Sequence, residues 1–230
     1  NEGKVVGYAH LDLTDKVEGP SAEFVVHPSH RKAGIGQSLL KALQESAGGT
    51  LRLWSHGDLS EAKSIAERNG FTRVRTVIQM RRSLNDPIPE LAHEIAIRNF
   101  LPGIDNDEWI ALNNRTFIDH PEQGNWTTRD LEVRTKEDWF DPQGFLISEE
   151  KSVMTGFCWT KIHNEFVNQD PIGELYVIGV DPAESGKGIG RAVCTEGLIY
   201  LKEKGIKQAI LYVDDDNEAG KGLYESLGFE

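Results

Sequence analysis

The sequence predicts an α/β protein built from two tandem copies of one domain. Residues 27–36 (HPSHRKAGIG) and 181–190 (DPAESGKGIG) form two related segments, called here the first and second glycine loops. Each loop follows a run of apolar, strand-prone residues and precedes a helical pattern, and each copy closes on Gly-Phe, at 70–71 and 228–229. A strand, a glycine-rich turn and a helix in that order favour anion binding, because the free N–H groups of the first helical turn face the ligand.

Composition limits the class of protein. The chain has 230 residues, 38% apolar and 27% charged, which suits two small domains. It contains no signal-peptide pattern and no apolar run near the roughly 20 residues of a membrane span. A net charge of −12 argues against a nucleic-acid partner. Cys158 and Cys194 fall in predicted core segments, which indicates buried free thiols and a reducing, cytoplasmic setting. We expect a monomer.

The first copy is expected to span residues 1–84. Its pattern predicts strands near 3–13, 22–27, 50–55 and 72–81, and helices near 33–47 and 59–69. Gly48-Gly49 ends the first of these helices. Because the chain starts inside a strand pattern, we expect this domain to lack its opening elements.

A linker at 85–92, marked by Pro87 and Pro89, separates the copies. The second copy, 93–230, opens with a strand near 95–98 and helices near 105–117 and 127–139. It continues with strands near 144–148, 153–162, 174–180 and 207–213, and helices near 188–204 and 217–227. Its last strand is expected to be cut short at Glu230.

The glycine loops fit neither common nucleotide motif. A phosphate-binding P-loop ends in Gly-Lys-Ser or Gly-Lys-Thr, and a dinucleotide fold needs a helical crossover to a parallel strand and a later acidic residue. Instead, Arg31, Gly34 and Gly36 match a pattern that resembles the acyl-coenzyme A loop of the GCN5-related N-acetyltransferases. The second loop departs from it, with Ser185 in place of Gln or Arg. Glycines that only cap turns are the alternative explanation.

Three longer segments, 117–124, 159–163 and 173–182, resemble the mycothiol synthase family of tandem N-acetyltransferases. The resemblance implies two domains, each a mixed, mostly antiparallel sheet flanked by helices. It also implies transfer of an acetyl group from acetyl-CoA to the cysteinyl amine of cysteinyl-glucosaminyl-inositol, which yields mycothiol. No metal is expected, since no His, Cys and carboxylate cluster has ligand spacing.

Differences between the copies predict which one is catalytic. Amide formation from a thioester requires a neutral amine, and an α-amino group has a pKa of about 8, so a base is needed. When the copies are aligned on the glycine loops, Glu174 falls opposite Pro20. When they are aligned on the Gly-Phe ends, Tyr224 falls opposite Ala66 and Asn217 opposite Leu59. Glu174 is the candidate base, acting directly or through water, and Tyr224 stands where the superfamily often places the acid that protonates the CoA sulfur. A solvated carboxylate and a core tyrosine are the alternatives.

Other residues complete the expected site. Gly179 within a strand suggests a bulge that frees a backbone N–H for the oxyanion. Asp119 and Lys161 match family positions for substrate contact, with surface salt bridges as the alternative, and Tyr212 is expected to line the same pocket. His120 and His163 are expected to shape loops.

Contacts to acetyl-CoA are expected at the glycine loops and nearby. In the second copy they are Ile178, Gly179, Val180, Ser185, Gly186, Lys187, Gly188, Ile189, Gly190, Arg191, Asn217, Glu218, Ala219, Gly220, Lys221 and Gly222. In the first copy they are Phe24, Val25, Val26, Lys32, Ala33, Gly34, Ile35, Gly36 and Gln37. We expect the first copy to bind acetyl-CoA, one molecule per domain, without turnover.

Two rival functions remain at this point. One is acetylation of another amine, such as a peptide N-terminus or an aminoglycoside. The other is an acetyl-CoA sensor without turnover, against which the presence of Glu174, Asn217 and Tyr224 in only one copy argues.

Overall fold

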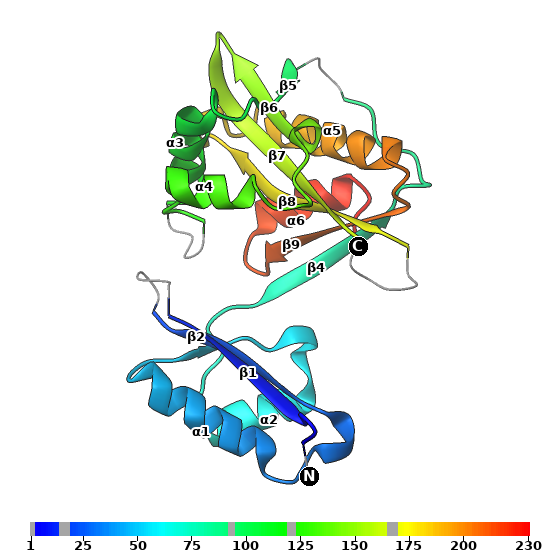
Figure 1. Cartoon of the computed structure of the whole chain (residues 1–230). Helices are drawn as coiled ribbons and strands as arrows, with labels where there is room; N and C mark the ends of the chain where they lie inside the picture. The colour runs from blue at the N-terminus through cyan, green and yellow to red at the C-terminus, as the bar shows by residue number, and fades with distance from the viewer. Residues whose placement is uncertain (1–2, 14–18, 92–94, 119–122, 165–169) are drawn as a thin grey trace. The chain divides into compact units, whose positions relative to one another are not determined.

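The structure is a computed structural model that describes residues 3–13, 19–91, 95–118, 123–164 and 170–230. The chain divides into two compact units, Asn1–Val74 and Arg75–Glu230 (Figure 1). Both are α/β, as the sequence predicts.

The first unit is a three-stranded sheet in the order β1-β2-β3, in which β1 and β2 are antiparallel and β2 and β3 parallel. Leu43 of the first helix packs with Ala22 and Leu51 to form a small core on one face of the sheet. Gly48 adopts a left-handed conformation and ends that helix, as expected. The elements are β1 (Gly7–Asp12), β2 (Ser21–Val26), α1 (Ile35–Ala47), β3 (Arg52–Leu53) and α2 (Ser60–Arg68).

The second unit is a six-stranded mixed sheet in the order β4-β9-β8-β7-β6-β5. Every neighbouring pair is antiparallel except β8 and β9, so the prediction of a mixed, mostly antiparallel sheet is confirmed. Its elements are β4 (Val77–Ser83), β5 (Ile97–Asn99), α3 (Asn106–Thr116), α4 (Thr128–Arg134), β6 (Phe145–Glu150), β7 (Val153–His163), β8 (Ile172–Val180), α5 (Ile189–Glu203), β9 (Gln208–Asp214) and α6 (Glu218–Ser226).

Helices cover both faces of this sheet (Figure 1), and a core lies beneath them on each face. On one face, α3 and α4 pack over an aromatic cluster centred on Trp109, Phe145 and Trp159. On the other, α5 and α6 pack over aliphatic side chains and both cysteines. Cys158 and Cys194 are buried free thiols, as predicted.

The position of β4 corrects the expected domain boundary. The sequence predicts this strand in the first copy, with a linker at 85–92, whereas the structure pairs β4 with β9 in the second unit. The backbone of Arg81 on β4 also exchanges two hydrogen bonds with Glu230. Met80 and Leu84 are buried in the core under α5 and α6, and this burial holds the strand there. The boundary between the units therefore follows Val74.

The helix expected at 127–139 ends early, at Arg134. Thr127 caps its start through a capping box with Asp130. Near its end, the Thr135 hydroxyl donates to the carbonyl of Leu131, a bond that competes with continued helix. None of the helices in the described part of the chain has the length and apolar character of a membrane span.

Candidate active site

The two glycine loops have the same backbone geometry. Each begins with a 3₁₀ turn capped by a side chain, His27 in the first loop and Asp181 in the second. Each then enters the next helix through a left-handed glycine, Gly34 or Gly188, both with φ of 82°. Because no side chain caps either helix, the N–H groups of its first turn remain available to an anion.

Small residues let the start of α5 lie close to its neighbours. A Cβ atom at Gly190 would lie 3.2 Å from Leu223 on α6, and a Cβ atom at Gly156 on β7 would lie 2.6 Å from Ile189. Gly7 on β1 has the matching place in the first unit, since Gly7 pairs with Val26 and Gly156 with Val180. Sequence reasoning missed this pair, although both glycines interrupt strand patterns and could have been found on that basis.

The second sheet opens beside the glycine loop. Within the described ranges, the parallel strands β8 and β9 are paired only at Gly173 with Ala209 and Glu174 with Ile210. Beyond these pairs β8 runs to the glycine loop, while β9 runs to the start of α6. The result is a wedge between the two strands, with Glu174 at its apex.

A bulge on β8 lies directly after the apex. The register with β7 shifts between Trp159, which pairs with Val177, and Thr160, which pairs with Leu175, so Tyr176 is the extra residue. The bulge was expected at Gly179, which instead pairs regularly with Phe157. Only glycine fits at position 179 without a shift of its neighbours, because a Cβ atom there would lie 2.5 Å from the Phe157 ring. β1 and β2, by contrast, pair in unbroken register at all six positions.

The bulge also corrects the expected face of one side chain. Alternation along a regular strand would place Glu174, Tyr176 and Ile178 on one face. With an extra residue at Tyr176, Ile178 instead packs toward the core under α5 and α6. Tyr176 packs with the aromatic cluster on the opposite face.

Glu174 is 8% exposed, so it is not the solvated carboxylate considered as an alternative. Its Oε2 atom lies 2.6 Å from Nε2 of His163 on β7. Lys161 is its cross-strand partner, and the ammonium group lies over the rings of Trp139 and Tyr176, 4.9 and 5.8 Å from their centroids. A buried carboxylate with one bonded oxygen keeps a second oxygen for another partner.

Tyr224 on α6 is 8% exposed and lies in the core with both cysteines. Burial raises the pKa of its phenol far above the ordinary value, and the neighbouring Cys194 and Cys158 add to the shift. Hydrogen bonding with Cys194 in turn raises the pKa of Cys158, and burial adds to it. A phenol in this environment stays protonated at neutral pH, as a proton donor must.

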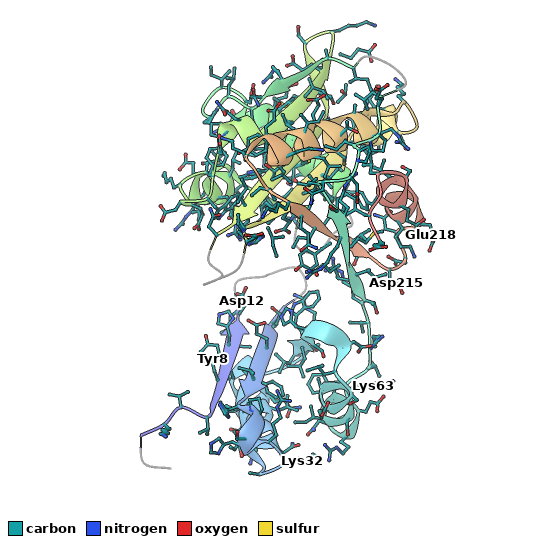
Figure 2. The ribbon with its side chains drawn as sticks, turned by 90° about the vertical axis from the view of Figure 1, so that its right-hand side faces the viewer. Tyr8, Asp12, Lys32, Lys63, Asp215 and Glu218 are labelled. Atoms are coloured by element: carbon teal, nitrogen blue, oxygen red, sulfur yellow. The ribbon has the colours of Figure 1, made fainter. Side chains whose placement is uncertain are left out.

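The start of α6 borders the other side of the wedge. Asn217 is its N-cap, and the side-chain oxygen accepts a hydrogen bond from Gly220 N–H at 2.8 Å. Lys221 forms ion pairs with Glu218 at 2.7 Å and Asp215 at 3.6 Å, and both carboxylates are labelled in Figure 2. Asn217 therefore caps the start of α6 with its side chain, whereas Leu59, at the start of α2, makes no such hydrogen bond.

The structure also shows the partners of the other residues that the sequence predicts at the site. Tyr212 on β9 is 53% exposed, and its hydroxyl accepts a hydrogen bond from Gln79 of β4 at 2.6 Å, a partner that sequence reasoning missed. Arg191 of α5 donates to Ser226 at 2.6 Å and so ties α5 to α6. Lys187 pairs with Glu184 within the loop. Asp119 and His120 lie outside the described residues.

The first unit keeps the loop but differs around it. Lys32, labelled in Figure 2, has the left-handed φ of 61° that Gly186 has in the second loop at 80°. Arg31 donates to the Val26 carbonyl, and Gln37 exchanges two hydrogen bonds with Asn69. The other expected contacts lie on β2 (Phe24, Val25, Val26), in the loop (Ala33, Gly34) and at the start of α1 (Ile35, Gly36).

Comparison with known proteins gives the family. The Acetyltransferase (GNAT) family model matches residues 107–229, and a GNAT domain model matches residues 1–73. The mycothiol acetyltransferase of Acidothermus cellulolyticus is 48% identical over 100% of this chain and 74% of its own length. This chain is a member of the mycothiol acetyltransferase family of tandem GNAT proteins. The relative from Thermomonospora curvata is also 48% identical, over 99% of this chain and 76% of its own length.

Solved structures agree on the fold. A GCN5-related N-acetyltransferase from Sphaerobacter thermophilus superposes with a TM-score of 0.79 at 24% identity, covering 99% of this chain and 74% of that one. A tandem GNAT protein from the clavulanic acid biosynthesis pathway gives 0.72 at 18% identity, covering 100% and 77%. These likenesses show the fold, and the family models together with the curated relatives make the chain an N-acetyltransferase of tandem GNAT architecture.

Proposed function

We propose that the second unit transfers an acetyl group from acetyl-CoA to the cysteinyl amine of cysteinyl-glucosaminyl-inositol, which yields mycothiol. The observation that carries the proposal is the wedge between β8 and β9, with buried Glu174 at its apex and the bulge at Tyr176 beside it. The first unit has Ser21 at the place of Glu174, since the extra residue of β8 shifts the match by one from the expected Pro20. It also has an unbulged strand pair, and Ala66 stands at the place of Tyr224. The acceptor follows from the family, whose relatives are named mycothiol acetyltransferases.

The chain offers acetyl-CoA a fitting site. The uncapped first turn of α5 and the left-handed Gly186 and Gly188 suit the pyrophosphate, since they present backbone N–H groups without Cβ atoms in the way. The end of β8, at Ile178, Gly179 and Val180, is an open strand edge along which an amide-containing arm can pair.

Glu174 serves as the base. It takes a proton from the ammonium form of the acceptor, and the neutral nitrogen attacks the thioester carbonyl. A backbone N–H beside the bulge at Tyr176, rather than at the regularly paired Gly179, stabilises the oxyanion, a contact worth roughly 3 kcal/mol. Glu174 passes this first proton to solvent and then takes the second proton from the nitrogen as the C–N bond forms. Two protons leave the nitrogen and one is delivered to the CoA sulfur, so one proton is released in the net reaction.

Tyr224 serves as the acid. When the tetrahedral intermediate collapses, the C–S bond breaks and the departing thiolate takes the phenolic proton. The phenolate then recovers a proton from solvent.

Selectivity for nitrogen over sulfur is a matter of positioning. The acceptor thiol, with an ordinary pKa of about 8.5, is a competing nucleophile. A base fixed at the wedge apex favours the amine, while Lys161, Tyr212 and Asp119 contact the hydroxyl-rich sugar and inositol.

The first unit is proposed to hold a second acetyl-CoA molecule without turnover. Its loop has the same left-handed residues, at Lys32 and Gly34. It has neither the base nor the acid. We place the protein in the cytoplasm as a monomer.

Mass spectrometry of a reaction between acetyl-CoA and cysteinyl-glucosaminyl-inositol tests the function. We expect one added acetyl group on the amine, with the thiol still open to alkylation. Acetylation of a peptide or aminoglycoside amine instead would overturn the acceptor. Saturable acetyl-CoA binding with no product from any acceptor would point to a sensor.

A further inference from the structure

His163 and Glu174 form an enclosed pair beside the wedge. Their side chains are 16% and 10% exposed, and Nε2 of His163 lies 2.6 Å from Oε2 of Glu174. His163 ends β7 opposite Ile172, and Glu174 stands opposite Lys161, so the contact runs diagonally across two paired strands. Both backbones are fixed by the sheet, which limits the freedom of the contact.

The contact restricts the carboxylate. Among the residues that the structure describes, the imidazole is bonded to Oε2, which hinders rotation of the carboxyl group and leaves Oε1 for a substrate proton. The neighbouring cation, Lys161, lies over the Trp139 and Tyr176 rings. A general base must lie within about 2.6–3.2 Å of the atom that carries the proton, so a carboxylate held in one orientation favours that geometry.

We propose that His163 is a positioning residue, which holds Glu174 with Oε1 directed to the acceptor amine. The inference rests on the proposed role of Glu174 as base. The His–Glu bond contributes to turnover, and binding of acetyl-CoA does not depend on it.

The first unit supplies a matched control. His56 and Glu23 form a pair of the same kind at 2.8 Å, but their side chains are 79% and 49% exposed. Neither residue belongs to the first glycine loop or to the proposed catalytic machinery. His56→Leu therefore removes the same type of contact without touching the wedge.

The test compares His163→Leu, His163→Gln, Glu174→Gln and His56→Leu in steady-state kinetics with acetyl-CoA and cysteinyl-glucosaminyl-inositol. We expect His163→Leu to lower kcat roughly 10- to 100-fold, the effect of one charge-assisted hydrogen bond, with KM for acetyl-CoA unchanged. His163→Gln, whose amide can donate to Oε2, should restore most of the loss. His56→Leu should match the unaltered enzyme.

A double variant separates positioning from a general structural role. In the Glu174→Gln background, adding His163→Leu should cause no further loss, because the group that His163 positions is already disabled. Independent, additive losses would overturn the proposal, as would equal damage from His163→Leu and His163→Gln. Full activity of Glu174→Gln would instead overturn the assignment of the base.

Discussion

At the scale of single residues, the two proposed catalytic groups have opposite surroundings. Glu174 has a polar neighbour, the imidazole of His163, within hydrogen-bond distance. Tyr224 lies among apolar side chains and two thiols, and burial raises the pKa of its phenol. The carboxylate with a polar neighbour fits a base, and the buried, protonated phenol fits a proton donor.

Tyr224→Phe is expected to lower kcat roughly 100-fold or more, the usual contribution of a general acid, while acetyl-CoA binding is largely spared. Tyr200→Phe is the control, since that phenol donates to Asp141 at 2.8 Å and has no place in the chemistry. Stopped-flow release of CoA thiol and equilibrium titration with acetyl-CoA measure the two effects. Unchanged turnover in Tyr224→Phe would remove this residue from the mechanism.

Glu174→Gln is expected to lower activity most at low pH. There the acceptor amine is largely protonated, and a base is needed to free it. The rate against pH between about 6 and 9, measured at saturating acetyl-CoA, gives the answer. A uniform loss across this range would indicate a role in substrate binding.

At the scale of elements, the second glycine loop leads into α5, and α5 can begin where it does because the neighbouring strand β7 has no side chain at Gly156. Gly156 on β7 leaves room for Ile189, the first residue of α5. The first unit repeats the arrangement more loosely, since a Cβ atom at Gly7 would lie 3.1 Å from Leu39 and 3.2 Å from Ile35. The contact between β7 and the start of α5 should therefore tolerate an added side chain less well than the contact between β1 and α1.

Gly156→Ala is expected to displace the start of α5 and weaken acetyl-CoA binding several-fold. The overpacking should also lower the free energy of unfolding by about 1–3 kcal/mol. Gly7→Ala should cost less and leave turnover intact. Calorimetric titration and thermal unfolding of the two variants test this, and equal effects at both positions would contradict it.

Most helices and strands could be predicted from the sequence because their apolar residues recur with a clear period. The helix expected at 188–204 is observed at Ile189–Glu203, and the strand expected at 174–180 at Ile172–Val180. The prediction of a bulge at Gly179 was wrong. A glycine within a strand can mark either a bulge or a close neighbouring side chain, and at Gly179 the close neighbour is Phe157. The contact of His163 with Glu174 depends on strand register, which sequence alone does not give.

At the scale of the whole molecule, the boundary between the two sequence repeats differs from the boundary between the two compact units. β4 follows the first copy along the chain, yet it pairs with β9 and with the backbone of Glu230 in the second unit. Strand pairing joins segments far apart in sequence, so a repeat cannot show which sheet its last strand enters.

The fragment 75–230 is therefore expected to unfold cooperatively, whereas 85–230 should be much less stable. Loss of Met80 and Leu84 from the core removes roughly 3–6 kcal/mol, a large part of the stability of an ordinary domain. Urea unfolding followed by circular dichroism compares the two fragments. Equal midpoints would restore the boundary at residue 84.

The central claim is that acetyl transfer occurs in the second unit. Gly34 and Gly188 have the same φ of 82° and open space around them, so valine at either position imposes a similar strain of about 1–2 kcal/mol. The decisive measurement is the rate of cysteinyl amine acetylation by Gly34→Val and Gly188→Val. We predict a loss of tenfold or more in kcat/KM for acetyl-CoA with Gly188→Val and near-normal turnover with Gly34→Val. The reverse pattern would contradict the account.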